Sequence, residues 1–190
     1  LFDVIKERTG ETCLIEMDHV RFDSERRTVF YKDIDLSEFD ALIIKKIGPE
    51  YSPAYLDRLE LLRFLSEKRG VRIFSPPENI IRILDRLSCT ISLQINDIPL
   101  PPTTVTEDLE VAIDAVKEYD KAVLKPLFST KAKGMIIIDQ KDDIRGKIEK
   151  YMRSGHKVLY IQKVIDIPER DFGLVFIGGE YIATYARVKN

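Results

Sequence analysis

The sequence has 190 residues, of which 44% are hydrophobic and 33% are charged. This composition is typical of a soluble globular protein with one sizeable core or two small lobes. A formal net charge of -2 gives no overall basic field, so neither nucleic acid nor a membrane surface is expected as a partner. No apolar run is long enough to span a bilayer and no signal peptide is recognisable, which predicts a cytoplasmic protein.

The cysteines and histidines form no motif. Cys13 and Cys89 stand far apart and are expected to be reduced residues of the core. His19 and His156 lack the spacing of metal ligands, so a zinc site is not expected. Functional chemistry is therefore expected from other residue types.

The N-terminal part predicts a small α/β domain. Candidate strands, each short and apolar, lie at 13–17, 28–31, 41–44 and 71–74. The continuous apolar run at 41–44 is typical of a strand buried on both faces of a parallel sheet. Ser52-Pro53 predicts the start of a helix, and Gly70 predicts its end. Strand, helix and strand in this order indicate a crossover unit with two parallel strands.

A proline-rich boundary follows at Ser75-Pro76-Pro77. Two helices are predicted at 78–84 and 86–95, before a rigid, extended segment at 97–102. Thr106 is the predicted N-cap of the next helix, whose first turn is acidic.

The segment 125–134, which reads KPLFSTKAKG, is the most distinctive part of the sequence. It connects two apolar, strand-like runs at 122–124 and 135–138. A lysine at a strand end is held at a fixed point, and small residues allow backbone N–H groups to converge on an anion. The pattern suits the binding of a polyphosphate. Taken alone, the same residues equally suit an exposed hairpin loop whose lysines keep a sheet edge soluble.

The C-terminal third predicts one helix and three strands. The helix is expected at 142–152, and a strand at 158–161 continues into 162–165. A Gly178-Gly179 turn between apolar runs at 172–177 and 181–187 predicts a β-hairpin.

Four segments in a fixed order carry a family resemblance. They are Asp85-Arg86 followed by Thr90 and 98–103, the run 123–126 with its loop, the run 160–165, and 170–176 with Gly178-Gly179-Glu180. Together they resemble the ATP-grasp superfamily, in particular its branch of carboxylate-amine ligases similar to RimK and glutathione synthetase. The resemblance runs from about residue 75 to residue 187.

The resemblance implies an ATP-binding role for the segment 125–134, called the lysine loop below. Lys125 matches the lysine that reaches the nucleotide phosphates. Arg86 stands where a lysine is usual, so the charge is kept while the geometry changes. Ser129 and Ala132 occupy glycine-like positions of a phosphate-covering loop. The ATP-binding residues expected in this region are Arg86, Lys125, Ser129, Thr130, Lys131 and Gly134.

The resemblance also implies roles further along the chain. Gln162, Lys163 and Val164 match the hinge between the lobes, whose backbone groups read the edge of adenine. Asp171 matches an aspartate near the ribose. Arg187 matches an arginine that faces the reaction centre and is the expected catalytic residue.

Each of these residues alone also has a purely structural explanation. Asp85 with Arg86 reads equally well as a surface pair between two helices. Gln162 and Lys163 also suit the solvent-exposed end of a strand, and Asp171 also suits a turn in which it accepts hydrogen bonds from the backbone. The order of the four segments favours the ATP-binding interpretation.

The implied activity is an ATP- and Mg²⁺-dependent ligase. ATP would phosphorylate a small-molecule or peptide carboxylate, and an amine would attack the acyl phosphate to form an amide. Glutamate or a similar amino acid is the expected addition. The family's magnesium ligands lie beyond the point that Arg187 matches, so we expect them after residue 190 and expect the chain as given to be inactive.

A second function stays open. The departures at Ala132 and Gly173 also suit a nucleotide-binding regulatory module that keeps the ATP cleft without ligase activity. The oligomeric state is open as well.

The expected fold class is α/β, with an N-terminal α/β domain followed by a partial ATP-grasp fold. The expected segments are the N-terminal domain at 1–75, a helical link at 76–102, a central lid lobe at 103–165 and the start of a C-terminal lobe at 166–190.

Overall fold

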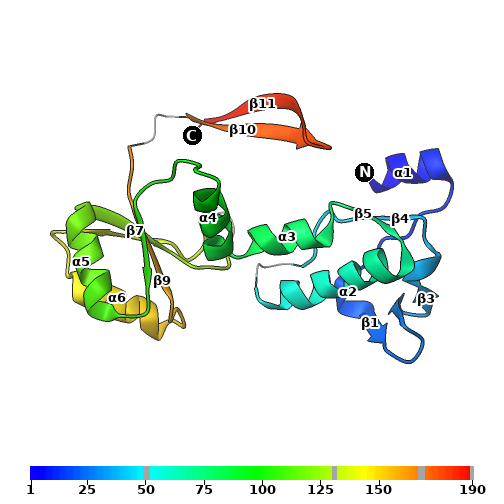
Figure 1. The fold of residues 1–190 in the computed structure, drawn as a ribbon, viewed down its shortest axis with the longest axis horizontal. Helices are drawn as coiled ribbons and strands as arrows, with labels where there is room; N and C mark the ends of the chain where they lie inside the picture. Colours follow the sequence, from blue (N-terminus) through cyan, green and yellow to red (C-terminus); the bar gives the residue numbers. More distant parts are fainter. Residues whose placement is uncertain (49–51, 130–131, 167–169, 189–190) are drawn as a thin grey trace. The chain divides into compact units, whose positions relative to one another are not determined.

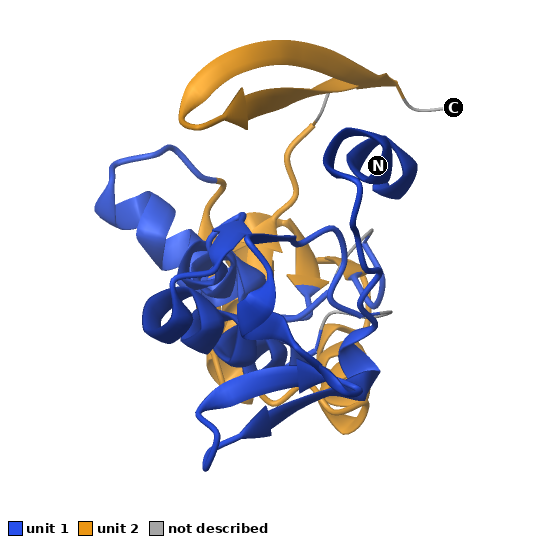
Figure 2. Ribbon diagram, turned by 90° about the vertical axis from the view of Figure 1, so that its right-hand side faces the viewer, with its two compact units in different colours: residues 1–100, 125–135 blue, residues 101–124, 136–190 orange. Residues whose placement is uncertain are grey.

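The computed structural model describes residues 1–48, 52–129, 132–166 and 170–188. The chain divides into two compact units, one of residues 1–100 and 125–135 and the other of residues 101–124 and 136–190 (Figure 2). Both units combine helices with sheets, which confirms the predicted α/β class. None of the helices in the described ranges has the length and apolarity that a membrane crossing requires.

The described residues of the first unit form two small sheets and four α-helices (Figure 1). Its elements are α1 (Phe2–Thr9), β1 (Val20–Asp23), β2 (Thr28–Tyr31), β3 (Ile34–Asp35), β4 (Ala41–Ile43), α2 (Ala54–Arg69), β5 (Arg72–Phe74), α3 (Pro77–Leu84) and α4 (Arg86–Ile95). Strands β1, β2 and β3 form an antiparallel sheet. Strands β4 and β5 are parallel and joined through α2, which confirms the predicted strand-helix-strand crossover.

Helix α2 packs its apolar stripe into this unit. Tyr55, Leu59, Leu62 and Leu65 are buried, at the spacing expected for one helix face. Gly70 ends the helix with a φ of 71°, a left-handed conformation that glycine adopts without a Cβ penalty. The sequence prediction of this helix and of its end is therefore confirmed.

The second unit contains a four-stranded sheet in the order β6-β9-β7-β8 and a separate hairpin. Its elements are β6 (Thr103–Thr106), α5 (Leu109–Tyr119), β7 (Lys121–Lys125), β8 (Ile136–Asp139), α6 (Ile144–Arg153), β9 (Leu159–Lys163), β10 (Arg170–Ile177) and β11 (Glu180–Val188). Helices α5 and α6 pack against each other and against the four-stranded sheet (Figure 1). Their shared core includes Val116, Leu124, Ile138, Ile148 and Ile161, all fully buried.

Aspartates start the two helices of this core. Asp108 caps α5 by accepting hydrogen bonds from the N–H groups of Glu110 and Val111, and Asp143 caps α6 in a similar way. The prediction that Thr106 is the N-cap of α5 is wrong. Thr106 ends β6, and its hydroxyl accepts from the Asp108 N–H, so the cap is Asp108 and the helix begins two residues later than expected.

Two strand predictions in the first unit also need correction. Residues 13–17 form no strand. Cys13, Ile15 and Met17 do pack against the core cluster of β2 and α2, so apolar alternation marks burial here without ladder pairing. The segment at 41–43 forms β4, but only Leu42 is buried and Ile43 is 49% exposed. The expected burial on both faces fails because α2 covers one face of a two-stranded sheet.

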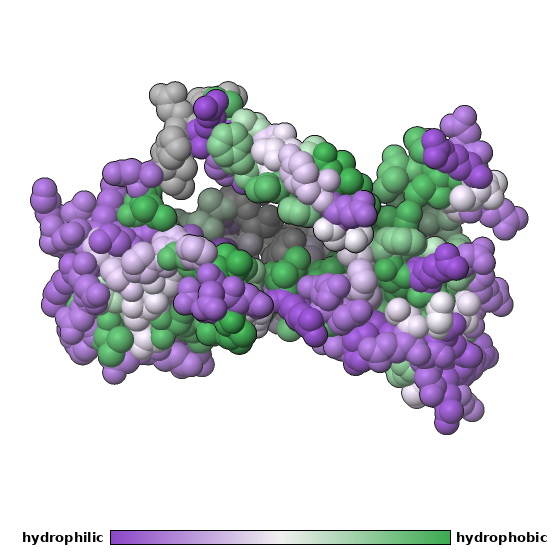
Figure 3. Space-filling view, turned by 45° about the horizontal axis from the view of Figure 1, so that its top comes forward, coloured by the Kyte–Doolittle hydropathy of each residue, from purple (hydrophilic) through white to green (hydrophobic). Residues whose placement is uncertain are grey.

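Strands β10 and β11 form the predicted hairpin around Gly178 and Gly179, whose φ angles of 61° and 89° match a tight hairpin turn. A bulge interrupts the register between Val175 and Phe176. Apolar side chains stay exposed along both strands and lie among polar ones in the space-filling view (Figure 3).

Candidate functional site

The lysine loop is fixed at its base by Arg86. The Arg86 Nε donates to the Pro126 carbonyl at 2.9 Å, and its Nη2 donates to the Ser129 hydroxyl at 2.9 Å. The Arg86 backbone N–H donates to the Leu127 carbonyl at 3.0 Å. Helix α4 begins at Arg86, since Asp85 caps it by accepting from the Ser88 N–H. Asp85 is thus an N-cap, and the explanation of Asp85 with Arg86 as a plain surface pair is wrong.

The other end of the loop turns back toward its base. Gly134 has a φ of 74°, and a Cβ placed on it would lie 3.0 Å from the Pro126 side chain. Ala132 has a φ of 59°, so it holds the left-handed conformation that usually calls for glycine. This conformation fits the glycine-like position expected at Ala132. Thr130 and Lys131, two further predicted site residues, lie outside the described residues.

Lys125 ends β7, and its partly buried ammonium lies in the field of Arg86. Burial lowers the pKa of Lys125, and the Arg86 guanidinium lowers it further. Two cations close together at a partly buried position disfavour each other's charge. A bound polyanion would offset that repulsion, which is the electrostatic requirement of a phosphate site.

Gln162 is buried in the second unit, at 8% exposure. Its Nε2 donates to the Thr103 hydroxyl at 2.9 Å, across the β6-β9 ladder, and lies 3.4 Å from the Tyr160 hydroxyl. The alternative that Gln162 is a solvent-exposed strand end is therefore wrong. The side chain joins the two strands.

The backbone of this predicted hinge is already partly occupied. The Lys163 N–H donates to the Pro102 carbonyl and the Val164 N–H donates to the Lys121 carbonyl, each at 2.9 Å. Two of the hinge's donors therefore serve the sheet. A ligand at this strand end would meet backbone carbonyls, or N–H groups beyond Val164.

Asp171 and Arg187 lie opposite each other on the hairpin. The Arg187 Nε donates to Asp171 Oδ1 at 3.0 Å, and its Nη2 donates to Oδ2 at 2.7 Å. The explanation of Asp171 as a turn residue is wrong, since it lies in β10. Gly173 and Tyr185 form a cross-strand pair two residues further along the hairpin from Asp171 and Arg187. The Tyr185 ring covers Gly173, where an added Cβ would lie 2.3 Å from the ring.

A family model matches the part of the chain that contains the loop, the hinge and the hairpin. Residues 91–190 match the ATP-grasp domain of prokaryotic glutathione synthetase, which is more than half of the chain. The chain belongs to this ATP-grasp family. The resemblance that the four sequence segments carry is thereby confirmed.

Curated relatives extend the ATP-grasp match toward the N-terminus. The chain is 30% identical over 175 residues to a tetrahydromethanopterin:alpha-L-glutamate ligase of Methanosarcina acetivorans, covering 86% of this chain and 54% of the relative. It is 27% identical to a glutathione synthetase of Nitrosomonas europaea, covering 78% of this chain and 45% of the relative. The chain therefore spans about half the length of these curated relatives.

Solved structures show the same fold. A RimK domain ATP-grasp protein from Sphaerobacter thermophilus superposes with a TM-score of 0.68 at 18% identity, covering 92% of this chain and 62% of that one. D-alanyl-alanine synthetase A from Vibrio cholerae superposes with a TM-score of 0.64 at 13% identity, covering 90% and 52%. At these identities the likeness concerns the fold.

The ATP-grasp residues of the first unit fit a nucleotide's phosphates better than a metal. Arg86 and Lys125 supply paired cations beside a tight turn, which suits a polyphosphate. Within the described ranges, no three or more His, Cys, Asp or Glu side chains are grouped to hold a metal ion. No step is therefore assigned to Mg²⁺ on these residues.

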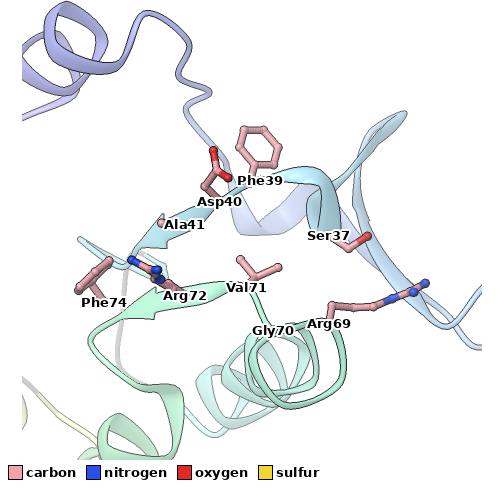
Figure 4. Close-up of a pocket in the computed structure, with 9 residues that line it drawn as sticks. All are labelled: Ser37, Phe39, Asp40, Ala41, Arg69, Gly70, Val71, Arg72 and Phe74. Atoms are coloured by element: carbon pink, nitrogen blue, oxygen red, sulfur yellow. The ribbon is translucent and has the colours of Figure 1, made fainter.

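A cavity of about 460 Å³ also lies in the first unit, beside Ser37, Arg69, Arg72 and Phe74 (Figure 4). It is lined by Ala41, the first residue of β4, and by Arg72 and Phe74, the first and last residues of β5. None of the predicted site residues lines this cavity, and we do not assign the candidate site to it.

The sequence did not identify the residues that hold the site residues in place. Phe128 packs against the cluster of Ile47, Tyr55, Leu59 and Leu84, which anchors the loop from its apolar side. A single aromatic residue within a lysine-rich loop is the signal that predicts such an anchor. Thr103 and Tyr160, the partners of Gln162, carried no signal, because strand pairing alone brings them to it.

Proposed function

We propose that this chain is part of an ATP-dependent carboxylate-amine ligase that acts through an acyl phosphate. The observation that carries the proposal is the pairing of Arg86 and Lys125 at the base of a tight loop in a chain of the ATP-grasp family. ATP supplies the phosphoryl group that activates the carboxylate, and the chain's own residues bind and orient it.

In this proposal Lys125 contacts the phosphates directly, and the loop from Ser129 to Gly134 covers them. The hinge at Gln162–Val164 offers backbone carbonyls to the adenine edge. Asp171 lies near the ribose, and Arg187 faces the reacting groups and offsets negative charge as it develops there. The Asp171 carboxylate orients Arg187 through two hydrogen bonds.

The relatives' names support an amino acid as one substrate. Two of the relatives described above are named a glutamate ligase and a glutathione synthetase, and each of these activities joins a carboxylate to an amine. We propose that the whole protein joins glutamate or a similar amino acid to a small-molecule or peptide partner. Mg²⁺ would accompany ATP, as it accompanies ADP in the structure of the ATP-grasp ligase PsnB.

The decisive experiment is a calorimetric titration of the 190-residue chain with MgATP, comparing wild type with Lys125→Ala. Loss of a charged hydrogen-bond partner should weaken binding by roughly 10- to 100-fold. Exposed Lys121→Ala, at the other end of β7, is the matched control and should bind ATP like wild type. Equal binding by both variants would place the phosphates elsewhere.

If the wild type binds no ATP, the same titration is repeated on a protein of the relatives' full length that contains this chain. A second failure would rule out the ATP site. In that full-length protein, ATP binding without ADP release in the presence of glutamate and candidate acceptors would favour the regulatory module over the ligase.

A further inference from the structure

Arg86 directs its donors at the protein's own loop. Its Nε and Nη2 reach Pro126 and Ser129, and its backbone N–H reaches Leu127. One residue therefore holds three of the four positions from 126 to 129. These contacts join parts of the chain 40 and 43 residues apart in sequence, so they fix a tertiary position and not a local turn.

The shape of the guanidinium group is essential to this arrangement. Its planar fork presents N–H groups at fixed angles, so it satisfies a carbonyl and a hydroxyl three residues apart at the same time. A lysine ammonium has the same charge but is a compact point donor on a flexible stem. Substitution by lysine would keep the electrostatic attraction for phosphate and lose the fork.

An apolar contact holds the same stretch from the other side. Phe128 packs against the cluster of Ile47, Tyr55, Leu59 and Leu84, and Pro126 is buried. The Arg86 hydrogen bonds lie on both sides of Phe128 in the sequence, at Pro126 and at Ser129. Residues 126–129 are thus attached to the first unit through both polar and apolar contacts.

We propose that Arg86 is a positioning residue that latches the loop base at 126–129, so that the loop is in place before ATP arrives. This assigns to Arg86 a role different from the direct nucleotide contact expected from the sequence. A pre-positioned loop lowers the ordering cost of binding, since fewer side chains and backbone angles are fixed when the ligand binds. The predicted effect on ATP binding rests on the proposed function. The latch, meaning the contacts by which Arg86 holds residues 126–129, does not.

The test uses the absence of tryptophan from the sequence. Phe128→Trp introduces a single fluorescent probe at the apolar anchor. In this background Arg86→Lys is compared with Arg82→Lys, an identical substitution at an exposed position of α3. Without nucleotide, Arg86→Lys should shift the emission to longer wavelength and increase quenching by acrylamide, while Arg82→Lys should leave both unchanged.

Amide hydrogen exchange in the native Phe128 background gives a second readout. The amide of residue 86 is bonded to Leu127, so its exchange reports release of the loop base. Losing charged hydrogen bonds should speed this exchange roughly tenfold or more in Arg86→Lys. Ser129→Ala removes one contact and should show a smaller increase. The thermal midpoint should change little, because the release is local.

Emission, quenching and exchange that are the same in Arg86→Lys and Arg82→Lys would overturn the latch. If Phe128→Trp does not fold, the exchange comparison decides alone. MgATP titration of the same variants separates the two proposals. Faster exchange with no ATP binding in any variant supports the latch and contradicts the ATP site, while roughly tenfold weaker binding in Arg86→Lys together with faster exchange supports both.

Discussion

Arg187 and Asp171 face each other across the hairpin as a two-point ion pair, with Nε to Oδ1 at 3.0 Å and Nη2 to Oδ2 at 2.7 Å. Both side chains are at least half exposed, at 61% and 50%. An exposed pair contributes little to stability, so its value here lies in the orientation that it gives to Arg187.

Asp171→Asn should therefore separate orientation from stability. We expect the free energy of unfolding to change by less than about 1 kcal/mol. In a full-length protein that contains this chain, the substitution should lower turnover, because Arg187 loses its fixed direction. Thermal melts and ADP-release assays measure the two effects. Exposed Asp114→Asn on α5 is the control, and an unchanged turnover in Asp171→Asn would show that Arg187 needs no partner.

We expect the charge of Lys125 to lower the stability of the folded chain while contributing to ATP binding. Its pKa is lowered by burial and by Arg86, so the charged form is disfavoured in the folded chain. Lys125→Met keeps the aliphatic stem and removes the charge, so we expect a higher melting temperature together with weaker ATP binding. A lower melting temperature in Lys125→Met would contradict this account of the cation pair.

The same residue predicts a pH dependence. Since the pKa of Lys125 is lower in the folded chain than its unfolded value of about 10.4, unfolding takes up a proton between the two values. The free energy of unfolding of wild type should therefore rise with pH in that alkaline range relative to Lys125→Met. Denaturant titrations from pH 8 to about pH 10.5 should show the difference between the two proteins shrinking.

Ala132 and Gly134 should respond in opposite directions to exchange of alanine and glycine. Ala132 has a φ of 59°, so Ala132→Gly removes a left-handed strain of roughly 1 kcal/mol, less the added entropy of the unfolded chain. Gly134→Ala adds that strain and places a Cβ 3.0 Å from the Pro126 side chain, so it should destabilise by about 1–2 kcal/mol. Thermal unfolding of the two variants tests this, and a shift of both in the same direction would contradict it.

Gln162 should tolerate leucine better than glutamate. The Thr103 hydroxyl donates to the Pro101 carbonyl at 2.8 Å, so it can only accept from position 162. Gln162→Glu would place a carboxylate against that acceptor and should cost roughly 1–3 kcal/mol of stability, whereas Gln162→Leu loses the hydrogen bonds to Thr103 and Tyr160 without adding a charge. Urea unfolding would measure the stability of both variants. A glutamate variant as stable as the leucine variant would mean that the Thr103 hydroxyl had rotated to donate to the new carboxylate.

Local features of the sequence predicted much of this fold. The stripe of α2, its end at Gly70 and the Gly178-Gly179 hairpin follow from period and backbone conformation within a few residues. The same holds for the strands on either side of the lysine loop. The strand predicted at residues 13–17 failed, because alternation reports burial and says nothing of a ladder partner.

For the candidate site too, local features could be predicted from the sequence and long-range contacts could not. The identity of its residues, including a lysine at a strand end and a glycine-like Ala132, was readable in the sequence, as was the ATP-grasp family. The partners of those residues were not: only the folded chain turns Arg86 onto Pro126 and Ser129, buries Gln162 against Thr103, and joins Asp171 to Arg187. The physical reason is range, since periodicity and turn propensity act over a few residues, whereas these contacts span 16 to 59 residues and form only when the core is packed.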